Sequence, residues 1–169
     1  MNQLEKFADI TTFFFDIDGV FTDNNLLITD AGEFLRSMNV RDGYAVKRAI
    51  RAGYRIVVIT GGSSPGVTQR LQGLGITEIH TGREKKLAVF DHLVEEDKLQ
   101  PQEILYLGDD LPDFPVMRKV GLPCCPADAV PEILGVSKYV SPYRGGEGCV
   151  RDVIEKVMRI KGEWTIPLD

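Results

Sequence analysis

Acidic side chains stand directly after a short apolar run near the start of this sequence. Asp16 and Asp18 are two residues apart, follow three consecutive phenylalanines and precede Gly19. Residues two apart in an extended chain point the same way, so both carboxylates can project from the end of one strand. A single acid in this position could instead cap a helix or stabilise a turn. The segment by itself therefore allows either a structural or a chemical role.

Two further segments repeat this arrangement. Thr60 follows the apolar run RIVVI, and Asp109 and Asp110 follow the run EILYL. Ligands of doubly wound sheets bind beyond the carboxyl ends of the strands. We therefore expect these side chains to gather with the first acidic pair at one edge of a sheet.

Several acids at one sheet edge indicate a cation, because close carboxylates repel one another. Asp113 follows Asp109 by about one turn and adds a further carboxylate. A site with only oxygen ligands and few carboxylates suits Mg²⁺. The sequence therefore predicts a magnesium site among these acids.

A basic side chain is expected to complete such a site. The segment GREKKLAVF provides Arg83, Lys85 and Lys86 at the start of a predicted helix. Basic side chains at a helix N-terminus oppose the helix dipole, which disfavours a purely solvated role. Helical register favours Lys86 as the residue that reaches the site.

The elements that must position these residues alternate along the chain. Short apolar runs rich in β-formers predict buried strands within residues 11–18, 55–62, 103–110, 121–128 and 138–143. Apolar residues at a helical period predict helices within residues 43–53, 64–75, 84–97, 113–121 and 150–160. In the second helix, Ser64 and Pro65 are the predicted cap and first turn, and Gly75 the stop. The alternation predicts an α/β fold with a doubly wound, parallel, Rossmann-like sheet.

The region from residue 20 to residue 42 breaks this alternation. Two extended stretches surround a turn at residues 29–32, which predicts a β-hairpin that projects from the sheet. The region contains too many apolar residues for a hairpin exposed to solvent. They are Leu26, Leu27, Ile28, Phe34, Leu35, Met38 and Val40. The alternative is a hairpin folded back on its own core.

The composition is typical of a soluble globular chain. A length of 169 residues corresponds to about one domain, which we expect to span residues 1–169. The net charge of −5 argues against general nucleic-acid binding, which depends on a basic surface. We find no apolar run of membrane-spanning length and no signal-peptide core, so we expect a cytoplasmic protein. Cys124, Cys125 and Cys149 match no zinc or disulfide pattern, so we expect reduced, buried thiols.

Four motifs occur in a set order along the chain: DIDGVFTDN, ITGG, a lysine directly after HTGREK, and GDDLPD. Together they resemble the haloacid dehalogenase superfamily of aspartyl phosphotransferases. The predicted hairpin and the segments GDDLPDFPVM and RGGEGCVRDVIE extend the resemblance over nearly the whole chain. They are similar to the small branch without a cap domain, whose members are phosphatases of 2-keto-3-deoxy sugar acid phosphates.

The resemblance implies a role for each matching residue. Asp16 would be the nucleophile that attacks phosphorus and forms an aspartyl-phosphate. Asp18 would protonate the leaving oxygen and then remove a proton from the attacking water. Thr60, Gly61 and Lys86 would bind the phosphoryl group, and the lysine would also restrain the nucleophile.

The resemblance also implies the ligands of Mg²⁺. They would be the carboxylate of Asp16, the backbone carbonyl of Asp18 and the carboxylate of Asp109. Asp110 and Asp113 would orient the lysine and metal-bound water. The cation would neutralise the charge between an anionic nucleophile and an anionic phosphate.

Only the hairpin and one helix separate the first two motifs, so no segment there could form a cap domain. In the branch that the chain resembles, the hairpins of four subunits form a barrel, and each neighbour covers an adjacent active site. The resemblance therefore implies a homotetramer, and the apolar hairpin agrees with it.

Two substrate groups occur in this branch, phosphates of eight-carbon and of nine-carbon sugar acids. Arg70 matches the basic residue that the branch directs across the subunit boundary toward the substrate carboxylate; its alternative is a solvent-exposed arginine. Gly62 and Gly73 depart from the glutamate and lysine of the nine-carbon enzymes, which favours the eight-carbon acid. Gly62 also departs from the basic residue found in many eight-carbon enzymes.

A glycine-rich loop precedes the last predicted helix. Relatives place an arginine here near the entrance of the site, which makes Arg144 a candidate substrate contact; its alternative is a plain loop residue. Glu147 stands where relatives often carry a second basic residue.

The leading hypothesis is a Mg²⁺-dependent phosphatase that converts 3-deoxy-D-manno-octulosonate 8-phosphate to the free sugar acid and phosphate, in lipopolysaccharide biosynthesis. The alternative enzyme hydrolyses a nine-carbon 9-phosphate of the sialic acid type. A hypothesis of another class is a non-catalytic oligomerisation module, which predicts losses among the catalytic residues.

Overall fold

The structure, a computed structural model, describes residues 3–165. Its centre is a sheet of parallel strands: β1 (Thr12–Phe15), β4 (Arg55–Ile59), β5 (Glu78–His80), β6 (Ile104–Leu107), β7 (Leu122–Cys125) and β8 (Tyr139–Val140). The strands lie in the order β5-β4-β1-β6-β7-β8, so the direction of winding reverses between β1 and β6. The predicted doubly wound α/β fold is confirmed.

The sequence of β1 explains its central position. Side chains alternate across a strand, so Phe13 and Phe15 stack together on one face while Phe14 packs against Phe90 on the other. The whole strand is buried, with β4 and β6 as its parallel neighbours. A continuous apolar run, rather than an alternating one, is typical of strands covered on both faces.

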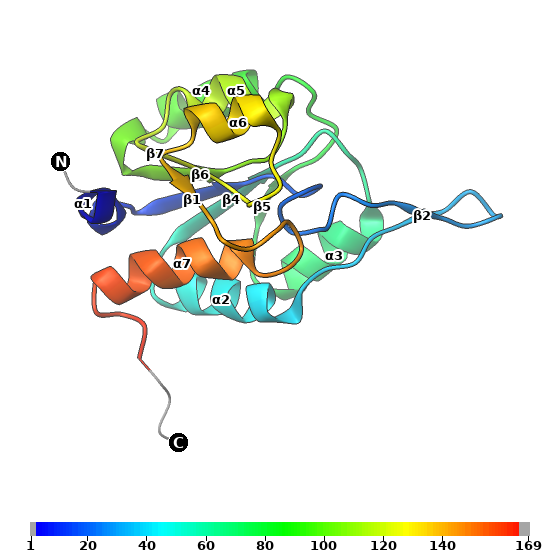
Figure 1. Cartoon of the computed structure of the whole chain (residues 1–169), viewed down its shortest axis with the longest axis horizontal. Coiled ribbons are helices and arrows are strands. Elements are labelled where there is room, and N and C mark those ends of the chain that lie inside the picture. Colours follow the sequence, from blue (N-terminus) through cyan, green and yellow to red (C-terminus); the bar gives the residue numbers. More distant parts are fainter. Residues whose placement is uncertain (1–2, 166–169) are drawn as a thin grey trace.

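Helices cover both faces of the sheet (Figure 1). One layer consists of α1 (Gln3–Ala8), α2 (Val40–Arg51), α3 (Pro65–Gly73) and α7 (Cys149–Ile160). The opposite layer consists of α4 (Lys86–Glu96), α5 (Phe114–Met117) and α6 (Pro131–Val136). Two 3₁₀ helices, η1 (Pro101–Glu103) and η2 (Leu111–Asp113), flank β6.

The predicted ends of α3 are confirmed. Ser64 is the N-cap, and its hydroxyl accepts a hydrogen bond from the amide of Val67. Pro65 is the first helical residue. Its missing N–H costs no hydrogen bond there, because the N–H groups of the first turn have no partner within the helix. Gly75 has a φ of +100° just beyond the helix, a conformation that favours glycine.

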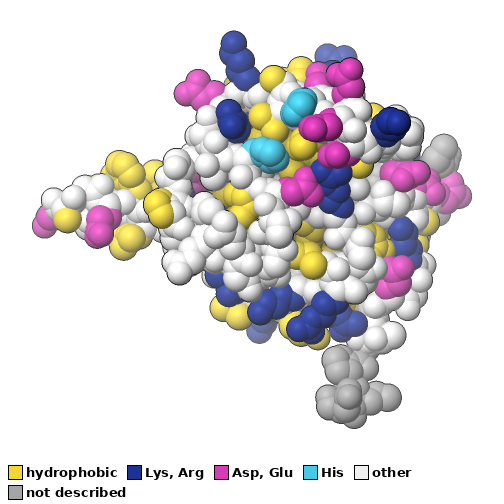
Figure 2. Space-filling model, turned by 180° about the vertical axis from the view of Figure 1, so that it is seen from behind, with side chains coloured by type: hydrophobic (Ala, Val, Ile, Leu, Met, Phe, Trp, Pro, Cys, Tyr) yellow, Lys and Arg dark blue, Asp and Glu magenta, His cyan; other side chains and the backbone are white. Residues whose placement is uncertain are grey.

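The predicted hairpin consists of β2 (Leu27–Ile28) and β3 (Phe34–Leu35), paired antiparallel. The amide of Gly32 donates to the carbonyl of Thr29 at 2.9 Å, which closes the predicted turn. The hairpin projects away from the sheet (Figure 1), and Figure 2 shows hydrophobic side chains along it. It is therefore not folded back on its own core. Between β1 and β4 the chain forms the hairpin and α2 and no further helix or strand, so the predicted absence of a cap domain is confirmed.

Three short elements lie outside the sequence-based prediction: α1, β5 and α6. Each has six residues or fewer, too few for a hydrophobic period to stand out. The three cysteines are free and buried, as expected. Within residues 3–165, no helix has the length and apolar character needed to cross a membrane.

Candidate active site

The carboxyl ends of three neighbouring strands form one edge of the sheet. Asp16 follows β1, Thr60 follows β4, and Asp109 lies two residues beyond β6. Because winding reverses between β1 and β6, the loops that leave these two strands diverge and open a crevice. The fold therefore gathers the predicted residues at the expected place.

A cavity of about 420 Å³ opens at this edge. It is lined by Asp16, Asp18, Asn24, Thr60, Gly61, Gly62, Glu84, Lys86, Asp109, Asp110 and Pro112. All predicted catalytic residues and both predicted carboxylate ligands of the metal lie in this lining.

Lys86 is the first residue of α4 and points its ammonium group into the acidic cluster. Nζ lies 2.8 Å from Oδ2 of Asp16 and 2.7 Å from Oδ1 of Asp113. Burial opposes the charge of the lysine, but these two carboxylates outweigh it and raise the pKa of Lys86. The structure thus selects Lys86 among the three candidate basic residues.

Asp113 is fully buried, and both oxygens of its carboxylate accept hydrogen bonds from protein groups. Oδ1 accepts from Lys86 and, at 2.6 Å, from the hydroxyl of Tyr106. Oδ2 accepts from the amide of Asp109 at 3.0 Å. Gly108 makes room for this carboxylate, since a Cβ there would lie 2.5 Å from Cγ of Asp113. Asp113 therefore holds the lysine through the contact at Oδ1.

Tyr106 is a member of the site that the sequence analysis missed. It lies within β6 and is fully buried, and burial raises the pKa of its hydroxyl well above the ordinary value. The residue is part of an apolar run, so sequence pattern alone assigns it to the core. Its hydrogen bond to Asp113 connects it to the site.

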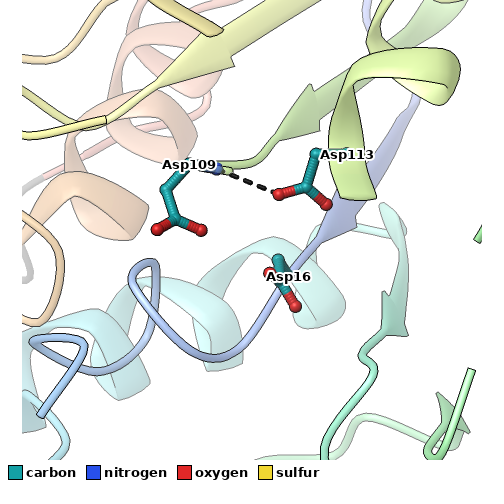
Figure 3. Close-up of side chains that lie close together, drawn as sticks. All are labelled: Asp16, Asp109 and Asp113. Atoms are coloured by element: carbon teal, nitrogen blue, oxygen red, sulfur yellow. Dashed lines mark hydrogen bonds between the residues drawn. The ribbon is translucent and has the colours of Figure 1, made fainter. Parts of the chain in front are cut away.

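Three carboxylates meet at this edge of the sheet. Asp16, Asp109 and Asp113 each offer an oxygen within 4.8 Å of the other two; Figure 3 shows Asp16 after β1, and Asp109 and Asp113 on the stretch that follows β6. Burial, followed by the charges of the neighbouring acids, raises the pKa of Asp16 to about 7 and that of Asp109 to about 8. Such a cluster favours a cation, because a cation offsets both the burial and the repulsion.

Asp109 retains an unused oxygen for a metal. Among the described residues, Oδ1 of Asp109 is buried without a hydrogen-bond partner, whereas both oxygens of Asp113 are occupied. Asp16 and Asp109 therefore fit Mg²⁺ as ligands, with oxygen donors only. Asp113 fits a supporting role instead.

Asn24 holds the other oxygen of Asp109. It has a φ of +68°, an uncommon conformation that asparagine tolerates, and its Nδ2 donates to Oδ2 of Asp109 at 2.9 Å. The contact joins residues far apart in the chain. Its only signal in the sequence is the asparagine that closes the DIDGVFTDN motif.

Asp18 lies at the rim of the cavity and is paired with an arginine that sequence reasoning also missed. Nε of Arg36, just beyond β3, donates to Oδ1 of Asp18 at 2.6 Å. Thr60 is buried, and its hydroxyl accepts from the amide of Gly62 at 3.2 Å. Asp110 is exposed and caps η2 through the amide of the following residue.

The two arginines predicted to contact substrate lie outside the cavity lining. Arg70 is exposed on α3, where its guanidinium group lies over Gly43 of α2. Arg144 is also exposed, and its Nε lies 3.4 Å from Oδ2 of Asp128. Within its own chain, neither residue joins the acidic cluster.

The glycines after Arg144 serve close packing. A Cβ on Gly145 would lie 2.1 Å from the carbonyl oxygen of Gly19, and one on Gly146 would lie 2.7 Å from the amide nitrogen of Asp23. The amide of Gly146 also donates to the carbonyl of Val20 at 3.0 Å. This loop therefore supports the turn that follows the first acidic pair.

Comparisons with known proteins agree with this geometry. The chain is 37% identical over 160 residues to the 3-deoxy-D-manno-octulosonate 8-phosphate phosphatase KdsC of Escherichia coli (strain K12), covering 95% of this chain and 85% of the relative. It is 36% identical over 160 residues to KdsC of Salmonella typhimurium, with the same coverage. No family model matches the chain.

Solved structures give the same picture. The 3-deoxy-D-manno-octulosonate 8-phosphate phosphatase of Yersinia pestis superposes with a TM-score of 0.91 at 35% identity, covering 95% of this chain and 86% of that one. The phosphatase of Moraxella catarrhalis, in complex with magnesium ion, phosphate ion and a KDO molecule, superposes with a TM-score of 0.90 at 29% identity. That match covers 94% of this chain and 91% of the other.

Proposed function

This chain belongs to the KdsC family of 3-deoxy-D-manno-octulosonate 8-phosphate phosphatases, in the haloacid dehalogenase superfamily, and we propose that it releases phosphate from that sugar acid ester. It is a phosphoric monoester hydrolase. The observation that carries the proposal is the acidic cluster around Lys86, in one cavity at the switch point of the sheet.

We propose Asp16 as the nucleophile. An oxygen of its carboxylate attacks phosphorus, the bond from phosphorus to the sugar oxygen breaks, and an aspartyl-phosphate forms. Water then attacks the same phosphorus, releases inorganic phosphate and restores the carboxylate. Lys86, 2.8 Å from Asp16, holds the nucleophile and lies where it can also contact the phosphoryl oxygens.

We propose Asp18 as the group that moves the protons. It donates one to the sugar oxygen as that oxygen leaves, and in the second step it removes one from the attacking water. Thr60 and Gly61 line the cavity beside it and bind the remaining phosphoryl oxygens.

The residues that would hold Mg²⁺ are Asp16 and Asp109, through their carboxylates, and Asp18, through its backbone carbonyl. When bound, Mg²⁺ supplies positive charge between the anionic nucleophile and the anionic phosphate. Asp113 keeps Lys86 in place through a contact of 2.7 Å. Asp110 also lines the cavity, and we propose that it orients water near the metal.

The eight-carbon acid is favoured over the nine-carbon acid. Gly62 and Gly73 lack the side chains of the nine-carbon pattern, and the relatives described above carry the eight-carbon name. Arg70 and Arg144 are the proposed contacts for the remainder of the substrate. Since Arg70 lies outside the cavity of its own chain, we assign it to the site of a neighbouring subunit.

A non-catalytic oligomerisation module is disfavoured. Such a module would be expected to lose catalytic residues, whereas Asp16, Asp18, Thr60, Lys86 and Asp109 all line one cavity here. Packing around the buried lysine does not by itself require several carboxylates, so their presence favours a catalytic role.

We propose a homotetramer in which the hairpins of four chains assemble and cover the active sites. Leu27 and Leu35 lie opposite each other on one face of the hairpin, and Ile28 and Phe34 lie opposite each other in the next pair, on the other face. All four side chains are exposed in the single chain. A two-stranded ribbon that is apolar on both faces needs partners to be stable in water.

We further propose that residues 1–169 act as one domain, in lipopolysaccharide biosynthesis in the cytoplasm. The first and last described helices, α1 and α7, pack in the same layer, which supports a single folding unit. The family of the chain supports the pathway.

The proposed activity is tested by phosphate release with Mg²⁺ from the eight-carbon 8-phosphate and from a nine-carbon 9-phosphate. We expect kcat/KM to favour the eight-carbon ester, because positions 62 and 73 lack the nine-carbon side chains. A preference for the nine-carbon ester would reverse the substrate assignment. No release from either ester would refute the proposed function.

A further inference from the structure

Arg36 is a buried arginine at the base of the hairpin, and none of the roles above uses it. Its side chain is only 8% exposed, although the neighbouring hairpin residues are exposed. Nε donates to Oδ1 of Asp18 at 2.6 Å, and Nη2 donates to Oδ2 at 3.3 Å. The hairpin therefore contributes a cation to the active site of its own chain.

The two oxygens of Asp18 are held unequally. The bond to Oδ1 is short, as expected for a charge-assisted hydrogen bond, whereas the contact to Oδ2 is long. A protonated carboxyl group still accepts a hydrogen bond on its second oxygen. The arrangement thus anchors Oδ1 and leaves Oδ2 as the more weakly held oxygen of the carboxylate.

Gly62 provides the space for this pair. A Cβ at residue 62 would lie 3.0 Å from Oδ2 of Asp18 and 3.5 Å from Nη2 of Arg36. A Cβ at this position would therefore press on Oδ2 of Asp18, whereas its distance to the guanidinium group is an ordinary van der Waals contact. The absence of a side chain at residue 62 and the arginine on the hairpin therefore form one arrangement.

We propose that Arg36 is a positioning residue for the proton-transfer steps of Asp18, acting from the hairpin through the bond to Oδ1. The inference rests on the proposed function, because it takes Asp18 as the acid and base. Arg36 orients the carboxylate so that Oδ2 faces the leaving oxygen. A displacement of about 1 Å at such a group can lower the rate by about 10²-fold.

The test compares two aryl phosphates that carry no carboxylate. Phenyl phosphate has a basic leaving group that needs a proton, whereas 4-nitrophenyl phosphate has a weakly basic one that needs much less help. For Arg36→Met we expect kcat/KM to fall about 10- to 100-fold with phenyl phosphate and less than about 3-fold with 4-nitrophenyl phosphate, on the scale of general acid catalysis. Arg36→Lys keeps the positive charge but loses the paired donors of the guanidinium group. Its kcat/KM with phenyl phosphate should lie between the values of wild type and Arg36→Met.

The matched control is Arg51→Met, which removes an exposed arginine at the end of α2. We expect it to leave kcat/KM unchanged with both aryl phosphates. Equal losses on both aryl esters with Arg36→Met would indicate a structural role and overturn the inference. A loss confined to the sugar acid phosphate would also overturn it, because Arg36 would then contact the substrate carboxylate.

A second readout does not depend on turnover. In wild type, the ¹H–¹⁵N resonance of Arg36 Nε should be protected from solvent exchange and shifted by its bond to Asp18, and Asp18→Ala should abolish this signature. Gly62→Ala should perturb it without removing a charge. Absence of the signature in wild type would overturn the inference whatever the activity. A wild-type protein that shows the signature but releases no phosphate would refute the proposed function alone.

Discussion

The buried acids of the site differ in what each can still bind. Asp113 is saturated by Lys86, Tyr106 and a backbone amide, so it acts as an anchor. Asp109 keeps Oδ1 buried and without a partner among the described residues. Burial raises the pKa of Asp109 to about 8 and that of Asp16 to about 7, so the charged site is costly without a cation.

Magnesium should therefore stabilise the folded protein. A ligand that binds only the folded state at 100 times its Kd adds about 2.7 kcal/mol. We expect Mg²⁺ to raise the melting temperature at pH 8 in wild type and in Asp91→Asn, a surface control. The increase should be lost in Asp109→Asn. An equal increase in Asp109→Asn, measured by calorimetry, would exclude Asp109 as a ligand.

Asp16→Asn should abolish turnover and preserve the fold. The amide cannot attack phosphorus, so we expect kcat to fall by more than about 10³-fold, the scale on which loss of a nucleophile acts. The circular dichroism spectrum should match that of wild type, because the change leaves the backbone and its neighbours in place. Substantial remaining activity would show that another group attacks phosphorus.

At the scale of elements, one buried carboxylate joins two helices. Asp42, in the first turn of α2, accepts a hydrogen bond from the amide of Arg151 in the first turn of α7, at 2.7 Å. The N-cap of α7 is Gly148, which has no side chain to cap the helix. Asp42 therefore caps α7 from a neighbouring helix.

This cap is expected to make stability depend on pH. Burial raises the pKa of Asp42 to about 6, opposed by the bond and charge of Arg151. The folded state then binds the proton more tightly than the unfolded state, so stability falls as pH rises from about 4 to about 6.

Asp42→Asn mimics the protonated carboxyl group and should remove this dependence. In urea unfolding, we expect the variant to be more stable than wild type at pH 8 by on the order of 1–2 kcal/mol. The difference should shrink as pH falls below about 6 and vanish near pH 4. A difference that is constant with pH would contradict the assignment.

At the scale of the whole molecule, the hairpin is the feature that the single chain leaves exposed. Phe34 is 58% exposed and Leu27 is 67% exposed, on opposite faces of the ribbon. Arg36 connects the same hairpin to Asp18. Assembly through the hairpin would therefore bear directly on the geometry of the active site.

Phe34→Asp should disrupt the proposed tetramer. A charge on the apolar ribbon cannot be buried without a partner, so we expect light scattering to report a smaller species and phosphate release to fall. The control is Leu134→Asp. Leu134 is an exposed apolar residue of α6, outside the hairpin, so this variant should leave the assembly intact. A wild-type monomer with full activity would refute the proposal that neighbouring hairpins cover the active sites.

The fold was largely predictable because its signals are local. The apolar run of β1 and the capped, proline-started helix after Ser64 each lie within a dozen residues of sequence. The short elements β5 and α6 were not predictable, because their few residues carry no clear period. β5 pairs at the edge of the sheet and α6 packs in the layer over it, so tertiary contacts set their positions.

Strand alternation and helical register are properties of adjacent residues, so the sequence indicates which strand ends carry acids and that Lys86 meets them. The presence of Arg36, Tyr106 and Asn24 in the site follows from long-range packing instead. Each is bound there by a residue that another element supplies, and a contact of this kind leaves no periodic trace in the chain. Likewise, only the fold placed Arg70 outside the cavity of its own chain, since position on α3 and position relative to the cavity are set by packing.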